Sequence, residues 1–151
     1  MKITILAVGK AKGKPEAILA LEYIKRLPWR ISIIEVEEKK PLSGQERMDS
    51  EGQKILKALP ENVLVVALDK SGEVYSSSMF AKAIQKWQLA GHSHIAFIIG
   101  GADGLSQAVY EVSTKKLSFG AMTWPHQLAR VMLLEQLYRS HAILSGHPYH
   151  K

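Results

Sequence analysis

The sequence predicts an α/β fold in which a mostly parallel sheet is flanked by helices on both faces. Short runs rich in Ile and Val alternate along the chain with segments of helical periodicity. The runs at residues 62–69 and His94–Ile99 are almost continuously apolar, which is typical of strands covered on both faces. Strands that alternate with helices favour a parallel sheet. Because no linker interrupts the 151 residues, we expect one domain over residues 1–151.

Local patterns predict the elements of the first third of the chain. Two Ile- and Val-rich runs, Lys2–Val8 and residues 31–36, are expected to be strands. Between them, Pro15–Arg26 has helical spacing, and Pro15 suits the first turn of a helix. The apolar residues that share one face of this helix are Ala17, Ile18, Leu21 and Ile24.

Start and stop signals predict the later elements. Residues 43–46 have the pattern of a capping box, and apolar residues at helical spacing follow as far as Leu59. The serines at 76–78 precede a further helix that Gly91 is expected to end. Residues 115–119 form a shorter candidate strand, and a long final helix is predicted from Pro125 to near Gly146.

The composition excludes several classes of protein and site. There are no cysteines, which excludes a disulfide scaffold and thiolate metal ligands. The first residues do not resemble a signal peptide, and the longest apolar run is too short to cross a bilayer, so a cytoplasmic location is expected. The net charge of +6 fits an anionic partner.

The positive charge is concentrated near the N-terminus. Residues 1–30 contain seven Lys or Arg and two Glu, and Lys10, Lys12 and Lys14 fall in one glycine-punctuated loop. Such a loop could hold a phosphate backbone, or it could be a solvated loop that keeps the protein soluble. The sequence leaves both interpretations open.

Three segments could carry chemistry. Residues 98–104 contain the end of a buried strand and the glycine-rich segment that follows it, which suits a binding loop or a structural turn. Their spacing matches neither the dinucleotide-binding motif nor the P-loop. Residues 117–126 mix small and large apolar residues and could line an apolar cleft. Taken alone, that second segment favours an ordinary turn before a helix, capped at Thr123.

The third segment is the C-terminal tail, residues 146–151. Four of the six histidines lie in the last 26 residues, but their spacing is not that of a zinc site. An aromatic side chain beside titratable and cationic groups suits contact with a nucleobase and a phosphate. The alternative is a disordered terminus. A hydrolase triad is poorly supported, because no G-x-S-x-G motif is present.

The final helix is apolar over more than one stripe. Such a helix needs a second surface to bury against, which favours a homodimer built on this helix. Complete burial within the monomer is the alternative.

Four segments, taken in order, resemble one family, the RlmH type of SPOUT methyltransferases. They are Ile98-Ile99-Gly100-Gly101-Ala102-Asp103-Gly104, Met122-Thr123-Trp124-Pro125-His126, Leu137-Tyr138-Arg139 and His147-Pro148-Tyr149-His150. The resemblance spans essentially the whole chain. Each motif is weak alone, but the four in this order and spacing are specific.

The resemblance implies a deep trefoil knot in the C-terminal part and S-adenosylmethionine bound in the knot loops, without metal. The implied reaction is methylation of N3 of a pseudouridine in 23S ribosomal RNA of the large subunit; naked RNA and the favoured assembled ribosome both stay open as substrate. The implied cofactor contacts are Leu68, Gly100, Phe119, Gly120, Ala121, Met122, Thr123 and Trp124. The implied target-base side comprises His126, Arg139, Tyr149, His150 and Lys151, where relatives often carry arginine.

A mechanism follows from this assignment. The sulfonium methyl of the cofactor is already electrophilic, so the protein must mainly position it. The proton on N3 must leave, and His126 and His150 are the candidates to take it, while Arg139 and Lys151 could stabilise negative charge or hold phosphate. In a dimer, the tail of one subunit could reach the cofactor of its partner. The main competing hypothesis is a non-catalytic RNA-binding or ribosome-associated factor. A nucleotide-binding hydrolase ranks last, because the sequence lacks the phosphate-binding loop that such an enzyme needs.

Overall fold

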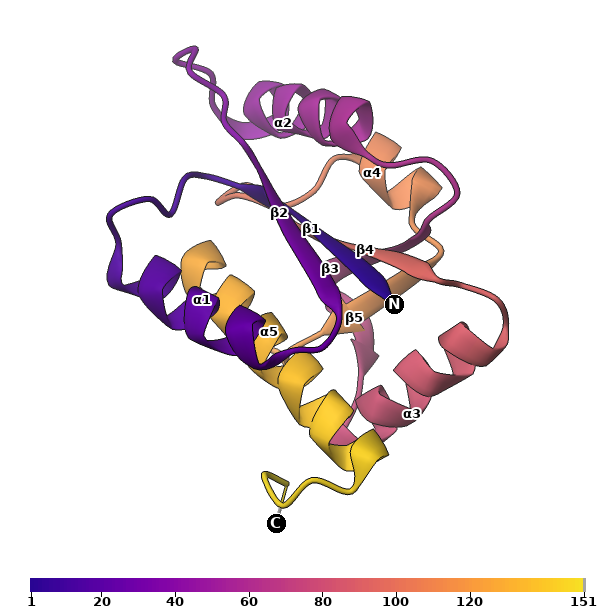
Figure 1. The fold of residues 1–151 in the computed structure, drawn as a ribbon. Helices are drawn as coiled ribbons and strands as arrows, with labels where there is room; N and C mark the ends of the chain where they lie inside the picture. Colours follow the sequence, from indigo (N-terminus) through magenta and orange to yellow (C-terminus); the bar gives the residue numbers. More distant parts are fainter. Residues whose placement is uncertain (151) are drawn as a thin grey trace.

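The computed structural model describes residues 1–150 as three layers, with a sheet between two layers of helices (Figure 1). The elements in chain order are β1 (Lys2–Val8), α1 (Pro15–Arg26), β2 (Arg30–Val36), α2 (Gly44–Ala58), β3 (Leu64–Val74), α3 (Ser77–Leu89), β4 (His94–Ile99), α4 (Gln107–Val112), β5 (Lys115–Ser118) and α5 (His126–Ser145).

The sheet has five strands in the order β2-β1-β4-β3-β5, and all four neighbouring pairs are parallel. The α/β fold with helices on both faces of a parallel sheet is therefore confirmed. Parallel strands place their carboxyl ends at one edge of the sheet, which is where ligands bind in folds of this kind.

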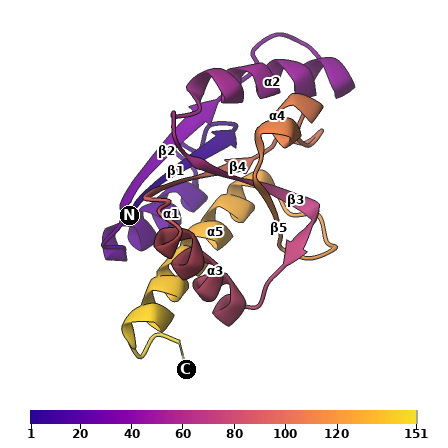
Figure 2. The ribbon, with the colours of Figure 1, turned by 90° about the vertical axis from the view of Figure 1, so that its right-hand side faces the viewer.

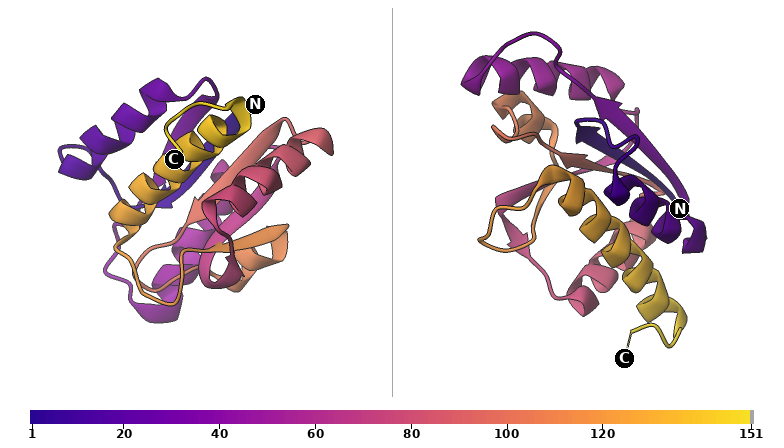
Figure 3. Two further views of the ribbon diagram at one scale, coloured as in Figure 1. Left: turned by 90° about the horizontal axis from the view of Figure 1, so that it is seen from below. Right: turned by 90° about the vertical axis from the view of Figure 1, so that its left-hand side faces the viewer.

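Side chains of each strand alternate between two cores. Ile95, Phe97 and Ile99 of β4 face the core beneath α1, α3 and α5, while Ala96 and Ile98 face the core beneath α2 and α4. Burial on both faces explains why this strand is a continuous apolar run. Figure 2 and the right view of Figure 3 show the two helical layers on opposite sides of the sheet.

The long helix α5 lies between α1 and α3, on the same face of the sheet (Figure 3, left). It therefore packs against a helix on each side and against the sheet below, and Leu133, Leu134 and Leu137 are completely buried. Packing on three sides explains why its apolar residues cover more than one stripe. Burial within the monomer thus accounts for much of the pattern that favoured a dimer in the sequence.

Several local details differ from the sequence prediction. The strand expected at residues 62–69 extends to Val74, because its second half pairs with β5 after a break between Leu68 and Glu73. Ser43 precedes α2, but its side chain makes no capping hydrogen bond, so the expected capping box is not formed. By contrast, Ser76 caps α3 by accepting a hydrogen bond from the Met79 backbone N–H.

The face predicted for α1 is divided. Ile18 and Leu21 are 68% and 53% exposed, whereas Ala20 is buried and Ile24 is half-buried against the core. Ile18 and Leu21 therefore form an exposed aliphatic pair on α1, which could contact a partner. No helix within residues 1–150 is both long enough and apolar enough to cross a membrane.

Candidate active-site cleft

A cleft of about 740 Å³ lies at the ends of β3, β4 and β5, where Leu68 pairs with Ile99 and with Leu117. Its walls are the ends of β3 and β4, the glycine loop that follows β4, and the connection from β5 to α5. This volume lies within the range of pockets that enclose a small organic ligand.

Nearly all of the residues proposed to contact a cofactor gather in this cleft. The residues of that set in its lining are Leu68, Gly100, Phe119, Gly120, Met122, Thr123 and Trp124. Ala121 is exposed and lies outside the lining. The Trp124 indole N–H donates to the Phe119 carbonyl across 3.4 Å, which closes the connection into a compact loop.

The glycine loop after β4 is crowded, which explains its composition. A Cβ added at Gly100 would lie 2.9 Å from the Gly104 carbonyl oxygen, so a side chain there would collide with the loop itself. A Cβ at Gly101 would lie 3.0 Å from a carboxylate oxygen of Glu51. Glu51 is buried behind the loop, and this burial raises the pKa of its carboxyl. Glycine at both positions therefore maintains the shape of the cleft wall.

A polar cluster forms one rim of the cleft. The Tyr110 hydroxyl donates to Asp69 across 2.5 Å, and the backbone N–H of Ser71 donates to the other Asp69 oxygen across 2.8 Å. Burial alone would raise the pKa of Asp69, but a hydrogen bond from the Ser71 hydroxyl, together with those from Tyr110 and the Ser71 N–H, outweighs it and lowers the pKa. The ammonium of Lys116 lies 4.4 Å from the centre of the Tyr110 ring. Sequence reasoning missed Tyr110, which belongs to the short helix α4.

His126 lies in the wall of the same cleft, in the first turn of α5. Its Nε2 lies so close to Gly9 that a Cβ there would come within 2.8 Å, and Gly9 also has a positive φ of 87°. Only glycine suits both conditions. Burial, together with the positive charges of Arg130 and Lys14, lowers the pKa of His126. The imidazole is therefore neutral at neutral pH and can accept a proton.

An ion pair between a buried arginine and a partly exposed glutamate secures this part of the cleft. Arg130 of α5 forms an ion pair of 2.5 Å with Glu35 of β2, and its guanidinium also donates to the Gly9 carbonyl across 3.0 Å. Burial alone would raise the pKa of Glu35, but the hydrogen bonds from Arg130 and from the Ala11 backbone lower it. Sequence reasoning missed both residues, although an arginine inside an otherwise apolar helix is a signal that a partner exists.

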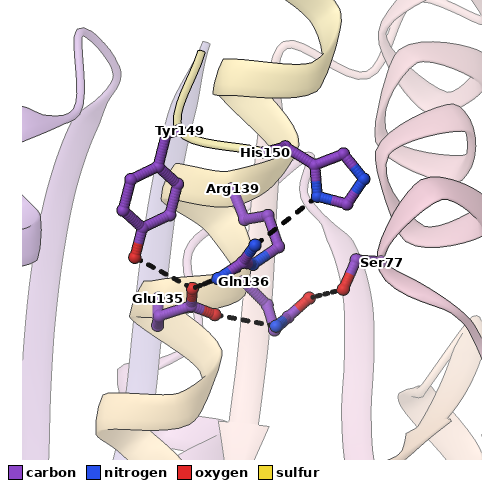
Figure 4. A network of polar contacts seen from close by, with 6 residues as sticks. All are labelled: Ser77, Glu135, Gln136, Arg139, Tyr149 and His150. Carbon is purple, nitrogen blue, oxygen red and sulfur yellow. Dashed lines mark hydrogen bonds and ion pairs between the residues drawn. The ribbon is translucent and has the colours of Figure 1, made fainter. Parts of the chain in front are cut away.

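The residues of the tail form a second cluster at the other end of α5 (Figure 4). Glu135 is its centre: one carboxylate oxygen accepts from the Arg139 guanidinium at 2.6 Å and from the Tyr149 hydroxyl at 3.1 Å. The Arg139 guanidinium also lies over the Tyr149 ring, 4.9 Å from its centre, and donates to His150 Nδ1 at 3.5 Å. Residues as far as His150 are thus folded back against α5. Lys151 lies outside the described residues.

The network continues away from the tail. Gln136 donates to the second carboxylate oxygen of Glu135 across 2.7 Å and accepts from the Ser77 hydroxyl of α3 across 2.8 Å. Burial, with contributions from Tyr23 and Glu135, raises the pKa of Tyr149 to about 12. Its hydroxyl is therefore a hydrogen-bond donor and not a base at neutral pH.

Of the five residues proposed for the target-base side, the four within the described part of the chain are divided between two places. His126 belongs to the cleft, whereas Arg139, Tyr149 and His150 form the tail cluster. Thirteen residues of α-helix separate His126 from Arg139, which corresponds to about 20 Å along the axis. A smaller pocket of about 420 Å³ lies beside Glu135 and shares Phe119 and Gly120 with the cleft.

The comparisons with known proteins identify the family of the chain. A family model described as "Predicted SPOUT methyltransferase" matches residues 1–150. The chain belongs to the SPOUT methyltransferase family. A protein of Paramagnetospirillum magneticum called ribosomal RNA large subunit methyltransferase H is 48% identical over 151 residues, covering 100% of this chain and 99% of the relative. A protein of Clostridium kluyveri with the same name is 46% identical over 159 residues, covering 100% of both chains.

In this SPOUT methyltransferase, the glycine loop and the β5–α5 connection both line one cleft. Within residues 1–150, no group of three or more His, Cys, Asp or Glu side chains is placed to hold a metal ion. The polar groups available in the cleft are backbone groups of the two loops and the side chains of its rim.

Proposed function

We propose that this chain transfers a methyl group from S-adenosylmethionine to N3 of a pseudouridine in 23S ribosomal RNA of the large subunit. The observation that carries the proposal is the cleft, which brings together seven of the eight residues assigned to the cofactor and places a neutral His126 in its wall. Membership of the SPOUT methyltransferase family supports the activity, and the names of full-length relatives support the ribosomal substrate.

The chemistry of the cleft fits this cofactor. S-adenosylmethionine supplies a methyl group on a sulfonium centre, and it also carries an adenine ring and an ammonium group. Leu68, Phe119 and Met122 offer apolar surface to a flat heteroaromatic ring, and the loop backbones offer amides and carbonyls. Asp69 and Asp103 place carboxylates at the cleft for a positively charged ligand.

His126 is the residue that we assign to the proton on N3 of the target base. Because its pKa is lowered, it is unprotonated at neutral pH and able to accept a proton. Arg139 keeps a positive charge that can stabilise an anionic base or hold a phosphate, and Tyr149 offers an aromatic face for stacking. His150 remains the second candidate for the proton.

A homodimer would bring the two clusters together. The outward stripe of α5 carries the exposed Leu128, the half-buried Met132 and, further along, Glu135 and Arg139 of the tail cluster. The neighbouring α1 exposes Ile18 and Leu21. Exposed aliphatic residues on two adjacent helices favour an interface. We propose that this interface places the tail of one subunit at the cleft of its partner.

We also propose that the C-terminal part forms a trefoil knot, as the family resemblance implies. Two placements support it: the 119–124 segment faces the 100–105 segment across the cleft, and the start of α5 reaches back to the end of β1 through Arg130. Single-molecule stretching from both termini tests this, because a knot keeps the unfolded contour shorter than the full chain length.

The experiment that tests the function compares the nucleosides of ribosomal RNA from cells with and without this protein by mass spectrometry. We expect one methylated pseudouridine in 23S RNA to disappear. Calorimetry with S-adenosylmethionine provides the second measurement, since a non-catalytic RNA-binding factor has no reason to bind it. A cytoplasmic location follows from the proposed ribosomal substrate.

A further inference from the structure

The loop between β1 and α1 presents a concentrated positive charge beside the cleft. Lys10, Lys12 and Lys14 are all exposed in this loop, while Ala11 between them is buried. Within residues 1–150, Lys10 pairs with Glu37 at 3.2 Å, whereas Lys12 and Lys14 form no ion pair. The nearest carboxylate in the sequence is Glu16, in the first turn of α1.

The backbone of this loop is held at several points. The Ala11 N–H donates to Glu35 across 2.8 Å, the Gln127 amide donates to the Lys10 carbonyl across 3.2 Å, and Arg130 donates to the Gly9 carbonyl. The Lys14 N–H closes a turn on the Ala11 carbonyl at 2.9 Å. A loop that is fixed in advance loses little conformational freedom when it binds a partner.

The loop is also fixed relative to the active-site cleft. Gly9 lies against the imidazole of His126, which lines the cleft. Gln127 and Arg130, which hold the loop, belong to the first turns of α5 immediately after His126. Figure 1 shows the loop running from β1 to α1 beside the start of α5. The positive charge of Lys14 acts on His126, as the lowered pKa of that residue indicates.

We propose that Lys12 and Lys14 form a phosphate-binding surface at the mouth of the cleft, which takes the RNA backbone close to the target nucleotide. This inference rests on the proposed function, because it assigns the partner as RNA. Two free ammonium groups on a preordered loop suit phosphodiester contacts, which position a nucleic acid without reading its sequence. The same loop would position the RNA backbone so that the target base lies at His126.

The test measures how affinity depends on salt for the double variant Lys12→Ala/Lys14→Ala. Each phosphate contact contributes about 0.7 to 0.9 to the slope of log affinity against log salt concentration, so losing two contacts should reduce the slope by about 1.4 to 1.8. The matched control is Lys82→Ala/Lys86→Ala, which removes the same charge from exposed positions on α3. The slope of the control should equal that of the wild type.

Two probes are used with each variant: large-subunit RNA stripped of protein, and assembled large subunits. We expect the slope to fall for both. An unchanged slope for both probes would overturn the inference, as would equal changes in the two double variants. A change confined to assembled subunits would support it as well, because the assembled ribosome is the favoured substrate and can present the target RNA where stripped RNA does not.

Binding of S-adenosylmethionine and methylation by the wild type separate this inference from the proposed function. Neither Lys12 nor Lys14 lines the cleft, so the affinity of the double variant for S-adenosylmethionine should equal that of the wild type. A wild type that methylates no ribosomal RNA would defeat the proposed function. A wild type that methylates, beside a loop variant with an unchanged salt slope, would defeat only the loop inference.

Discussion

The Tyr149 hydroxyl donates a hydrogen bond to Glu135 across 3.1 Å, which fastens the end of the chain to the middle of α5. The guanidinium of Arg139 donates to the same carboxylate and lies over the Tyr149 ring. One carboxylate therefore sets the positions of two side chains that we assign to the target base. The tail is an ordered part of the molecule as far as His150, and its contacts lead to the first prediction.

Glu135→Gln should lower the rate of methyl transfer by about tenfold to 150-fold. The change removes the charge that holds Arg139 and Tyr149, and hydrogen bonds to charged groups contribute about 1.5–3 kcal/mol. The affinity for S-adenosylmethionine should stay constant, because Glu135 does not line the cleft. Single-turnover methylation of large subunits measures the rate. Glu22→Gln is the control: it breaks the exposed ion pair with Lys25, and such pairs contribute little. Equal rates in the two variants would contradict the role of Glu135.

Ala102→Trp should obstruct the cleft. Ala102 is an exposed residue of the glycine loop and part of the cleft lining, so a larger side chain projects into the ligand space without disturbing the core. We expect affinity for S-adenosylmethionine to fall by about tenfold or more, or about 1.4 kcal/mol. Calorimetry measures this, with Ala90→Trp, at the exposed end of α3, as the control. Gly100 is a poorer choice, because a side chain there collides with Gly104 of the loop itself.

His126 should titrate below the ordinary histidine pKa of about 6.5. Because burial and two cations disfavour the charged form, the unfolded chain binds a proton more readily than the folded one. The contribution of His126 to the free energy of unfolding should therefore be constant above about pH 6.5. It should fall as the pH decreases from there through the lowered pKa. The acidic limb of the methylation rate should also lie below pH 6.5 if His126 takes the proton.

NMR titration of the imidazole separates the two lysines of the loop. Lys14 contributes to lowering the pKa of His126, so Lys14→Ala should raise this pKa toward its ordinary value. Lys12 is not among the groups that shift it, so Lys12→Ala serves as the control and should leave the pKa where it is. A His126 pKa at or above 6.5 in the wild type would contradict the effect of burial, Arg130 and Lys14 on this imidazole.

Leu128→Asp should dissociate the proposed dimer. Leu128 is 41% exposed in the monomer, so the charge is tolerated in a free subunit but is stranded in an interface. Leu133 would be a misleading choice, because it is completely buried and an aspartate there would unfold the monomer. Leu89→Asp, at a residue that is 83% exposed at the end of α3, is the control. Sedimentation measures the result, and a wild type that is monomeric at micromolar concentration would defeat the proposal.

The sequence predicts the fold well where periodicity is long and stop signals are clear. The bounds of β1, α1 and β4 match their predicted ranges, and α5 begins and ends within one residue of Pro125 and Gly146. It does not predict α4, which has six residues, too few to show helical periodicity. It also misses the second half of β3, where Glu73 and Val74 pair with β5 after the break in register.

The site is predictable to a similar degree. The family resemblance selects residues that meet in one cleft, although Ala121 lies outside its lining. It does not reveal Glu35 or Glu135, because their importance comes from contacts with residues that only the fold brings near. The separation of His126 from the tail cluster is likewise a property of the helix between them.

Mixing two inactive proteins should restore methylation if the tail of one subunit serves the cleft of its partner. One protein carries His126→Ala with an intact tail, and the other has an intact cleft but lacks residues 149–151. In a heterodimer formed by unfolding and refolding them together, one composite site has both defects, and the other has an intact cleft and an intact tail. Single-turnover methylation of large subunits should therefore recover in the mixture, whereas each protein refolded alone stays inactive.

The alternative arrangement predicts the opposite outcome. If each tail serves the cleft of its own chain, every site in the mixture keeps one defect, and no activity returns. The about 20 Å of α5 between His126 and Arg139 favours the arrangement between subunits, because Glu135 holds Arg139 and Tyr149 in the C-terminal half of the helix, away from His126. Sedimentation of the refolded mixture verifies that dimers have formed. Heterodimers without recovered methylation would show that the tail acts within its own subunit or not at all.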